Sequence, residues 1–262
     1  MKRLIINADD FGFTRDVNAG IVRAHTSGVL TSATLMANGE AFEDAVRLAR
    51  ETPTLDIGCH LVLVQGRSLL TGDVLPKGPR QLLWTLAQGG LDIYGELRLQ
   101  IEKICAAGVR PTHLDTHKHT HLLPRIFRTV VRLAYEFAIP YVRLPLDSTV
   151  RLAGCPPTFV EGFYRKVARQ RGVLLTDHFR GFRLTGSLTE ETFAAALADL
   201  PGGLTEFMCH PGLLGPDLAK AETRLKESRV LELKALTSPR IRKLIVESGV
   251  RLSPFCKTEL VP

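Results

Sequence analysis

Aromatic side chains, clustered cysteines and long apolar runs are all scarce in this chain of 262 residues. Aromatic residues make up only 6% of it, and its lysines and arginines are dispersed without any run of five or more. Surfaces that bind single-stranded nucleic acids combine basic grooves with aromatic platforms on which bases stack. The net charge of +7 therefore does not indicate a nucleic-acid partner, and we predict none.

The five cysteines lie about fifty residues apart, and no two of them form a C-x-x-C pair. An odd and dispersed set of this kind argues against a disulfide framework and against a zinc site built from thiolates. We expect most of the cysteines to be small buried hydrophobic residues.

The chain also has no apolar stretch near the roughly 18 residues that a membrane-spanning helix needs. Its first apolar run follows Lys2 and Arg3 and ends before Asn7, which makes it too short for a secretory signal. We therefore predict a cytoplasmic protein without an integral membrane segment.

Strand-like and helix-like segments alternate along the chain, whose hydrophobic content of 45% is sufficient for a large core. This order is typical of parallel strands joined by helices, and at this length it predicts one α/β domain, a (β/α) barrel, over residues 1–262. Residues 64–90 and 145–158 interrupt the alternation and are predicted to be loops, the first an insertion or lid. Strands are predicted near residues 4–10, 31–36, 55–63, 111–116, 141–144, 173–176, 204–209 and 250–252, and helices near 14–27, 41–52, 92–107, 123–137, 159–171, 189–199, 220–236 and 239–248.

The first predicted strand ends in two adjacent carboxylates, Asp9 and Asp10. Like charges this close raise one another's pKa or need a cation between them. The pair therefore indicates a metal site, an acid–base pair or both, although adjacent aspartates are also common in surface turns.

Polar residues recur where the other predicted strands end, and all such ends meet on one face of a parallel barrel. Each residue alone is compatible with a loop position or a core histidine, but their repetition at one end predicts a functional site. They are Asp9, Asp10, His60, Asp115, His117, Arg143, Asp177, His178 and His210.

The stretch 112–121 is the most specific local pattern, because a carboxylate and three histidines alternate in it. Asp115, His117, His119 and His121 would share one face if a strand continued through them. Imidazole and carboxylate ligands suit zinc, nickel, cobalt or iron, and magnesium when water completes the coordination. Asp115 could instead orient an imidazole, and a solvated histidine-rich loop is the alternative to a metal site.

Seven motifs, distributed in order over nearly the whole chain, are similar to those of the YdjC-like carbohydrate deacetylase family. That family includes chito-oligosaccharide deacetylases and hopanoid-biosynthesis deacetylases. The resemblance implies an irregular TIM-like barrel that hydrolyses N-acetyl groups of amino sugars with one divalent metal ion. The motifs are Asn7–Gly12, Thr31–Met36, Gly58–Leu61, Pro111–His119, Val142–Pro145, Thr176–Phe179 and Thr205–Pro211.

By the same resemblance, the metal ligands are Asp10, His60 and His117, and the ion is expected to be magnesium or zinc. We assign Asp9 as the general base and His210 as the general acid that protonates the leaving amine. Arg143 and His178 are predicted to hold the substrate or to stabilise the developing oxyanion, and Asp115 is predicted to bind the substrate.

The predicted reaction removes the N-acetyl group from an N-acetylglucosamine unit of a chito-oligosaccharide or other glycoconjugate and releases acetate. Amide cleavage needs a polarised carbonyl, an activated water and a protonated leaving nitrogen. Phosphoryl transfer would need more positive charge, for which only Arg143 and Lys118 are candidates near the strand ends. The alternatives are a deacetylase of a hopanoid-type glycolipid, a metal-dependent phosphoesterase and a non-catalytic carbohydrate-binding protein. The short 64–90 segment leaves the size of the substrate open, and no apolar face specifically indicates a homo-oligomer.

Overall fold

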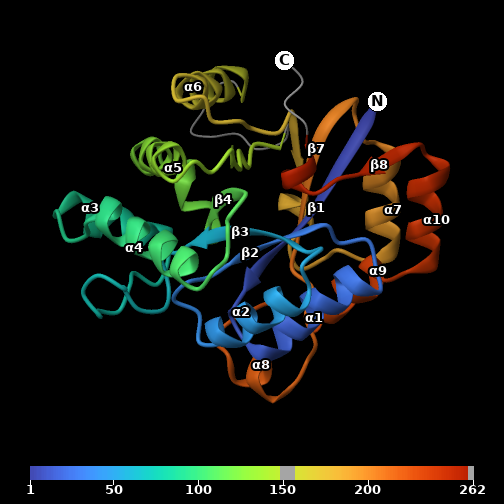
Figure 1. Cartoon of the computed structure of the whole chain (residues 1–262), viewed down its shortest axis with the longest axis horizontal. Helices are drawn as coiled ribbons and strands as arrows, with labels where there is room; N and C mark the ends of the chain where they lie inside the picture. Colours follow the sequence, from blue (N-terminus) through green and yellow to red (C-terminus); the bar gives the residue numbers. More distant parts are fainter. Residues whose placement is uncertain (148–156, 259–262) are drawn as a thin grey trace.

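A computed structural model describes residues 1–147 and 157–258, and eight parallel strands form one curved sheet at its centre (Figure 1). Neighbouring strands follow the order β5-β4-β3-β2-β1-β7-β6, and β8 pairs with β1. The strands are β1 (Lys2–Phe11), β2 (Ser32–Leu35), β3 (Asp56–Leu61), β4 (His113–Thr116), β5 (Tyr141–Val142), β6 (His178–Arg180), β7 (Gly203–Cys209) and β8 (Val250–Leu252).

Strand β1 lies at the centre of the sheet and carries neighbours on both edges. Residues Lys2 to Ala8 pair with β7, while the other edge pairs first with β8 and then with β2. Leu4, Ile5 and Ile6 are completely buried, and Ile5 packs in a different apolar cluster from its two neighbours. Both faces of β1 are therefore covered, as its unbroken apolar run predicts for a parallel strand.

The sheet is curled but does not close into a complete barrel within the described residues. Its edge strands β5 and β6 do not pair with each other through backbone hydrogen bonds. A single parallel bridge between Tyr141 and Leu174 lies where the barrel would close. The predicted α/β class and irregular barrel are confirmed in the form of a half-barrel of parallel strands.

Helices surround the outer side of the sheet, with α3 and α4 on one flank and α7 and α10 on the other (Figure 1). Several begin at side-chain caps: the Thr14 hydroxyl accepts the Val17 amide, and Asp92 accepts the Gly95 amide. The helices are α1 (Arg15–Thr26), α2 (Phe42–Glu51), α3 (Pro79–Ala87), α4 (Ile93–Ala106), α5 (Pro124–Glu136), α6 (Pro157–Arg169), α7 (Glu190–Ala198), α8 (Pro216–Lys220), α9 (Glu227–Leu236) and α10 (Pro239–Glu247).

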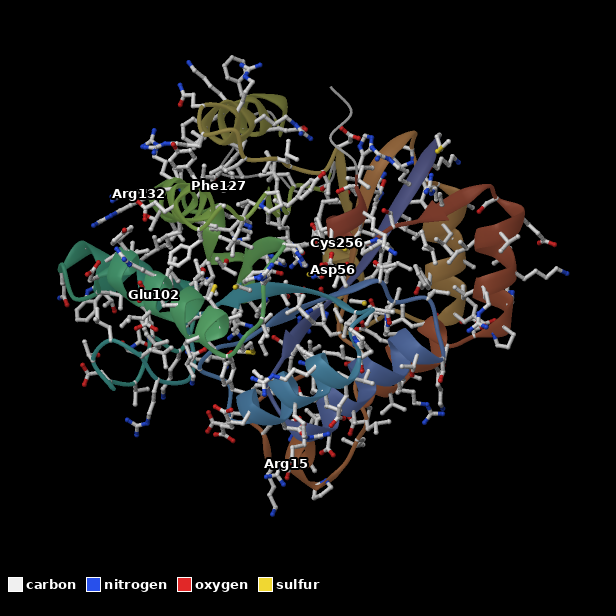
Figure 2. All side chains as sticks on the ribbon, in the orientation of Figure 1. Arg15, Asp56, Glu102, Phe127, Arg132 and Cys256 are labelled. Atoms are coloured by element: carbon white, nitrogen blue, oxygen red, sulfur yellow. The ribbon has the colours of Figure 1, made fainter. Side chains whose placement is uncertain are left out.

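A buried carboxylate ties the last part of the chain to the amino end of β3. Asp56 accepts hydrogen bonds from the Thr112 hydroxyl at 2.9 Å and from the Cys256 amide at 3.1 Å. Asp56 and Cys256, 200 residues apart in sequence, lie side by side in Figure 2. This end of the sheet is held by structural contacts, and the opposite end carries the site.

Three predicted elements differ from the structure. The apolar run 173–176 is not a strand, because β5 is only two residues long and offers a partner to Leu174 alone. The helix predicted at 220–236 forms only from residue 227, as α9, because α8 ends at Lys220 and residues 222–225 between the two helices line the cavity described below. The 64–90 excursion, predicted as a loop, contains helix α3, whose start at Pro79 follows Gly78.

The predicted loop at 145–158 lies mostly outside the described residues.

Two of the four described cysteines, Cys59 and Cys209, are buried, whereas Cys105 and Cys256 are exposed. The expectation that most are buried therefore holds for half of them. Among the described helices, none combines the length and the apolar character needed to cross a membrane.

Candidate metal centre

A cavity of about 580 Å³ opens at the carboxyl ends of the strands. It brings together five of the predicted site residues, which come from the ends of β1, β3, β4 and β7. Its lining consists of Asp9, Asp10, His60, Gln65, His117, Lys118, His119, Phe182, Thr185, His210, Glu222, Thr223, Arg224 and Leu225.

Asp9 and Asp10 both reach the cavity because β1 is irregular at its end. Neighbouring residues of a regular strand point to opposite faces of the sheet. Here the pairing of β1 with β2 shifts register between Ala8 and Phe11, and Asp10 has a left-handed φ of 69°. Such an irregularity re-aims a side chain, so the two carboxylates come to the same cavity.

Asp10, His60 and His117 present three ligand atoms at the corners of a triangle. Asp10 Oδ1 is 3.4 Å from His60 Nε2 and 3.1 Å from His117 Nδ1, and the two nitrogens are 3.2 Å apart. These separations match neighbouring ligands that each lie about 2.0–2.2 Å from one ion. Asp10 Oδ1 is buried and makes no hydrogen bond, which leaves it free to bind a cation. The three residues therefore fit a divalent metal ion.

The electrostatics of the triangle also favour a cation. Burial disfavours a charged imidazole, yet Asp115, Asp10 and Asp9 together raise the pKa of His60 to about 10. Excess negative charge surrounds the histidine, and a proton compensates for it when no metal is bound. A divalent ion would take over this role and displace the proton from the ligating nitrogen.

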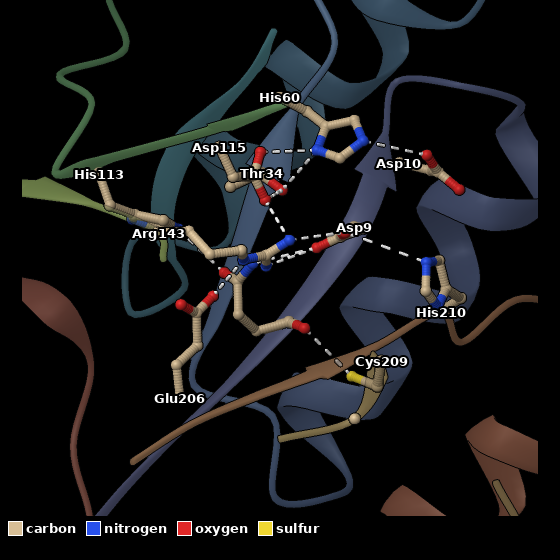
Figure 3. Close-up of polar contacts among 12 residues, drawn as sticks. Asp9, Asp10, Thr34, His60, His113, Asp115, Arg143, Glu206, Cys209 and His210 are labelled. Carbon is tan, nitrogen blue, oxygen red and sulfur yellow. Dashed lines mark hydrogen bonds and ion pairs between the residues drawn. The ribbon is translucent and has the colours of Figure 1, made fainter. Parts of the chain in front are cut away.

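Two of the candidate ligands, Asp10 and His60, make a hydrogen bond through the polar atom that does not face the triangle. Asp10 Oδ2 accepts a hydrogen bond of 2.5 Å from Arg229 Nη2, which leaves Oδ1 pointing into the triangle. His60 Nδ1 lies 2.6 Å from Asp115 Oδ1, so Nδ1–H donates a hydrogen bond to this oxygen and Nε2 is left to face the triangle (Figure 3). Such partners fix the orientation and the tautomer of a metal ligand.

Arg143 lies behind the cavity and binds three carboxylates (Figure 3). Its guanidinium contacts Asp9, Asp115 and Glu206 at distances of 2.7 Å each. Arg143 is 1% exposed and Asp115 is fully buried. The prediction that Arg143 and Asp115 contact the substrate is therefore wrong, because both side chains are enclosed by the residues that they orient.

His178 does not belong to the cavity either. It is the first residue of β6, pairs with Thr205 in the early part of β7, and places Nε2 3.1 Å from the Gly202 carbonyl oxygen. The predicted strand ended at Thr176, whereas the real one begins two residues later. His178 therefore lies at the wrong end of its strand, and its predicted role is corrected.

The histidines after β4 separate because the strand ends at Thr116. Residues His117–Leu122 form a 3-10 segment in which Lys118 and His119 have left-handed φ values of 53° and 51°. His121 turns away and is buried between the Thr116 hydroxyl and the Arg143 carbonyl oxygen. His119 lies on the cavity wall, so His117 is the member of the series that joins the triangle.

His210 follows β7 and faces Asp9 across the cavity. Its Nε2 is 3.9 Å from Asp9 Oδ2, and its backbone amide donates a hydrogen bond of 2.5 Å to Glu232 Oε2. Burial lowers the pKa of His210 to about 4, although Asp9 and Asp10 act in the opposite direction. The imidazole is therefore neutral near pH 7 in the free protein.

Arg229 and Glu232 are two site residues that were not predicted from the sequence; both lie on α9 and are each 1% exposed. They are three residues apart, so they share one face of the helix. Arg229 donates to the candidate ligand Asp10, and Glu232 accepts from the backbone amide of His210. Two charged residues at helical spacing beside apolar positions were the available signal, but solvent-exposed helix faces show the same pattern.

The sequence is similar to known proteins over nearly its full length. Residues 3–247 match the family described as YdjC-like protein. A carbohydrate deacetylase of Brevibacillus brevis is 36% identical over 97% of this chain and 98% of its own length. A chitooligosaccharide deacetylase of Yersinia enterocolitica is 34% identical, with the same coverage of both chains.

Solved structures agree with the fold. An Enterococcus faecalis protein superimposes with a TM-score of 0.82 at 26% identity, covering 99% of both chains. A lactam utilization protein of Thermus thermophilus superimposes with a TM-score of 0.52 at 17% identity, covering 96% of this chain and 99% of its own, and shares the fold alone. The full-length sequence matches confirm the resemblance seen in the motifs: the chain belongs to the YdjC-like family.

Proposed function

We propose that the protein is a metal-dependent carbohydrate deacetylase that removes the N-acetyl group from an N-acetylglucosamine unit and releases acetate. The deacetylase names of full-length relatives support this class of reaction. The observation that carries the proposal is the shared cavity, in which the ligand triangle lies beside Asp9 and His210. These two side chains approach each other to 3.9 Å, so both can reach one reacting group.

A divalent ion held by Asp10, His60 and His117 would polarise the acetyl carbonyl and lower the pKa of a bound water from about 15.7 toward 7. Two imidazoles and one carboxylate favour zinc over magnesium, because magnesium prefers oxygen ligands. We therefore expect zinc to bind more tightly, with magnesium as the alternative.

Asp9 is the proposed general base. Burial alone would raise the pKa of its carboxyl group, but Arg143, His60 and His210 hold that pKa below its usual value. The carboxylate is thus ionised, and the two hydrogen bonds from Arg143 fix its orientation. A base of this kind accepts a proton only from a strongly activated water, which confines the reaction to the loaded site.

His210 is the proposed proton donor to the leaving nitrogen. The imidazole is neutral in the free protein, because its pKa is lowered to about 4. The proton that it donates is therefore the one that Asp9 has taken from the water, passed on from Oδ2 to Nε2, which lie 3.9 Å apart in the free protein. Negative charge that develops on the acetyl oxygen favours the imidazolium in this complex. Glu232 holds the backbone of His210, so the ring stays at the edge of the cavity while it donates.

The phosphoesterase alternative has little support in this geometry. Phosphoryl transfer needs positive charge on three equatorial oxygens. Arg143 is already paired with three carboxylates and does not reach the cavity. Lys118 and Arg224 line the cavity, but a polar sugar ring is an equally suitable neighbour for them.

The test is an assay of acetate after incubation of the zinc-loaded protein with N,N′-diacetylchitobiose and, separately, with an N-acetylglucosaminyl lipid. Release from the first substrate, abolished by chelation and restored by metal, is the expected result. Release only from the lipid would select the glycolipid alternative. Release of phosphate from sugar phosphates, without acetate from either substrate, would contradict a deacetylase.

A further inference from the structure

We propose that Gln65, in the excursion between β3 and α4, is a positioning residue that makes His117 a ligand through Nδ1. This inference rests on the proposed metal centre and adds a residue from outside the strand ends to it. It also assigns the excursion a part in metal binding, in addition to its place in the cavity wall.

The two nitrogens of His117 have different neighbours. Nδ1 points into the triangle, 3.1 Å from Asp10 Oδ1 and 3.2 Å from His60 Nε2. Nε2 points out of it and lies 3.0 Å from Gln65 Oε1. A carboxamide oxygen only accepts hydrogen bonds, so the proton of a neutral His117 is held on Nε2. The lone pair on Nδ1 is then free for the metal.

Gln65 completes a pattern that the other two ligands already show. Asp10 is held by Arg229 and His60 by Asp115, each through the atom that does not face the triangle. In the described residues, the other polar contacts of the His117 ring both run from Nδ1 to the remaining corners of the triangle, Asp10 and His60, and the ring also makes an edge contact with His60. Gln65 is thus the partner of the nitrogen that faces away from the triangle. His117 begins a segment whose next two residues are left-handed, so its backbone alone does not determine the ring orientation.

The backbone of Gln65 is held in an unusual conformation for this contact. Its φ of 64° is left-handed, which costs free energy for a residue with a side chain. A short hairpin compensates for that cost: the Gln65 amide donates to the Pro76 carbonyl at 2.8 Å, and the Leu75 amide donates to the Gly66 carbonyl at 3.0 Å. Backbone hydrogen bonds of the hairpin thus fix the position from which the Gln65 carboxamide reaches His117.

A buried carboxylate on α4 anchors the same hairpin. Glu96 is fully buried and accepts hydrogen bonds from the Ser68 hydroxyl at 2.6 Å and from the amides of Leu69 and Leu70 at 3.1 and 3.0 Å. The Gln100 side chain donates to Glu96 at 2.6 Å. Hydrogen bonds therefore connect α4 to the hairpin, and the hairpin carries Gln65, which contacts His117.

The experiment compares three variants by competition titration with Zn²⁺ and a chromophoric chelator, without substrate. Gln65→Met keeps the length of the side chain and removes the acceptor, and we expect its Zn²⁺ affinity to fall about 10- to 100-fold. Gln65→Glu keeps an acceptor and should bind Zn²⁺ at least as tightly as the wild type. Arg67→Met, on the exposed part of the same hairpin, is the matched control and should leave the affinity unchanged.

Each outcome decides the proposal. Wild-type affinity in Gln65→Met, or an equal loss in Gln65→Met and Gln65→Glu, would overturn it, because the acceptor would then have no role of its own. Should Gln65→Met fail to fold, ¹⁵N NMR of the Zn²⁺-loaded wild type gives the answer: we expect metal on Nδ1 of His117 and a proton on Nε2, and the reverse assignment would contradict us. Neither readout involves turnover, so a protein inactive on acetylated sugars would still show the effect.

Discussion

Arg143 holds the carboxylate of Asp9 in two hydrogen bonds, of 2.8 Å from Nη1 and 2.7 Å from Nη2. The same guanidinium contacts Asp115, which in turn orients the proposed metal ligand His60. The proposed base and the proposed metal centre are thus joined through one buried cation. Changes at Arg143 should therefore affect stability, metal binding and turnover together.

Replacing Arg143 by methionine should lower the free energy of unfolding by about 3–5 kcal/mol, because three buried carboxylates lose their counter-charge. Urea unfolding followed by circular dichroism measures the difference. Arg132→Met serves as the control, since Arg132 is half exposed and pairs with Glu136 on the helix surface. That change should cost less than about 1 kcal/mol. Equal costs for the two variants would show that the Arg143 network does not stabilise the fold.

Alanine at His60 or His117, and asparagine at Asp10, should each reduce bound metal well below one equivalent. Every change removes or weakens one corner of the triangle that fits the ion. The readout is the metal content after dialysis, measured by inductively coupled plasma mass spectrometry. His178→Ala is a suitable control because this histidine lies outside the cavity. A full equivalent of metal in His60→Ala would remove His60 from the ligands.

Asp9→Asn and His210→Ala should keep the metal and lose turnover by at least about 100-fold, the usual contribution of a proton-transferring group. Acetate release is to be measured together with metal content, so that loss of chemistry is separated from loss of the ion. Wild-type turnover should depend on pH in a bell shape. Near-normal activity in either variant with metal bound would refute the role of that residue.

Glu206 should make the metal-free protein less stable as the pH rises. Burial raises the pKa of this carboxyl group from 4.5 to about 7, with Arg143 acting against the shift and Asp115 in favour of it. The folded state then binds the proton more tightly than the unfolded state, so this stabilising contribution is complete below about pH 4.5 and disappears as the pH rises to about 7.

Glu206→Gln should remove this dependence. The difference in unfolding free energy between the variant and the wild type should change by up to about 3 kcal/mol between pH 4.5 and pH 7.5, in favour of the variant at high pH. Urea titrations of both proteins across this range test the expectation. Parallel pH profiles would mean that Glu206 titrates alike in the folded and unfolded states.

Much of the site was predictable because parallel strands bring their carboxyl ends together. A position in the sequence just after a strand therefore implies a position near the cavity, which held for Asp9, Asp10, His60, His117 and His210. His178 is the exception, because the strand was predicted at residues 173–176 and β6 begins at His178 itself. A small error in a boundary moved that residue to the opposite end of the sheet.

Local sequence thus determined the alternation of strands and helices, the apolar centre of β1 and the identity of the polar residues at the strand ends. It did so because periodicity and strand ends are local properties. Only the tertiary structure decided which atoms face each other. The left-handed backbone at Asp10, the end of β4 at Thr116 and the partners Arg229 and Gln65 depend on contacts between segments far apart in the chain. No local pattern encodes such contacts.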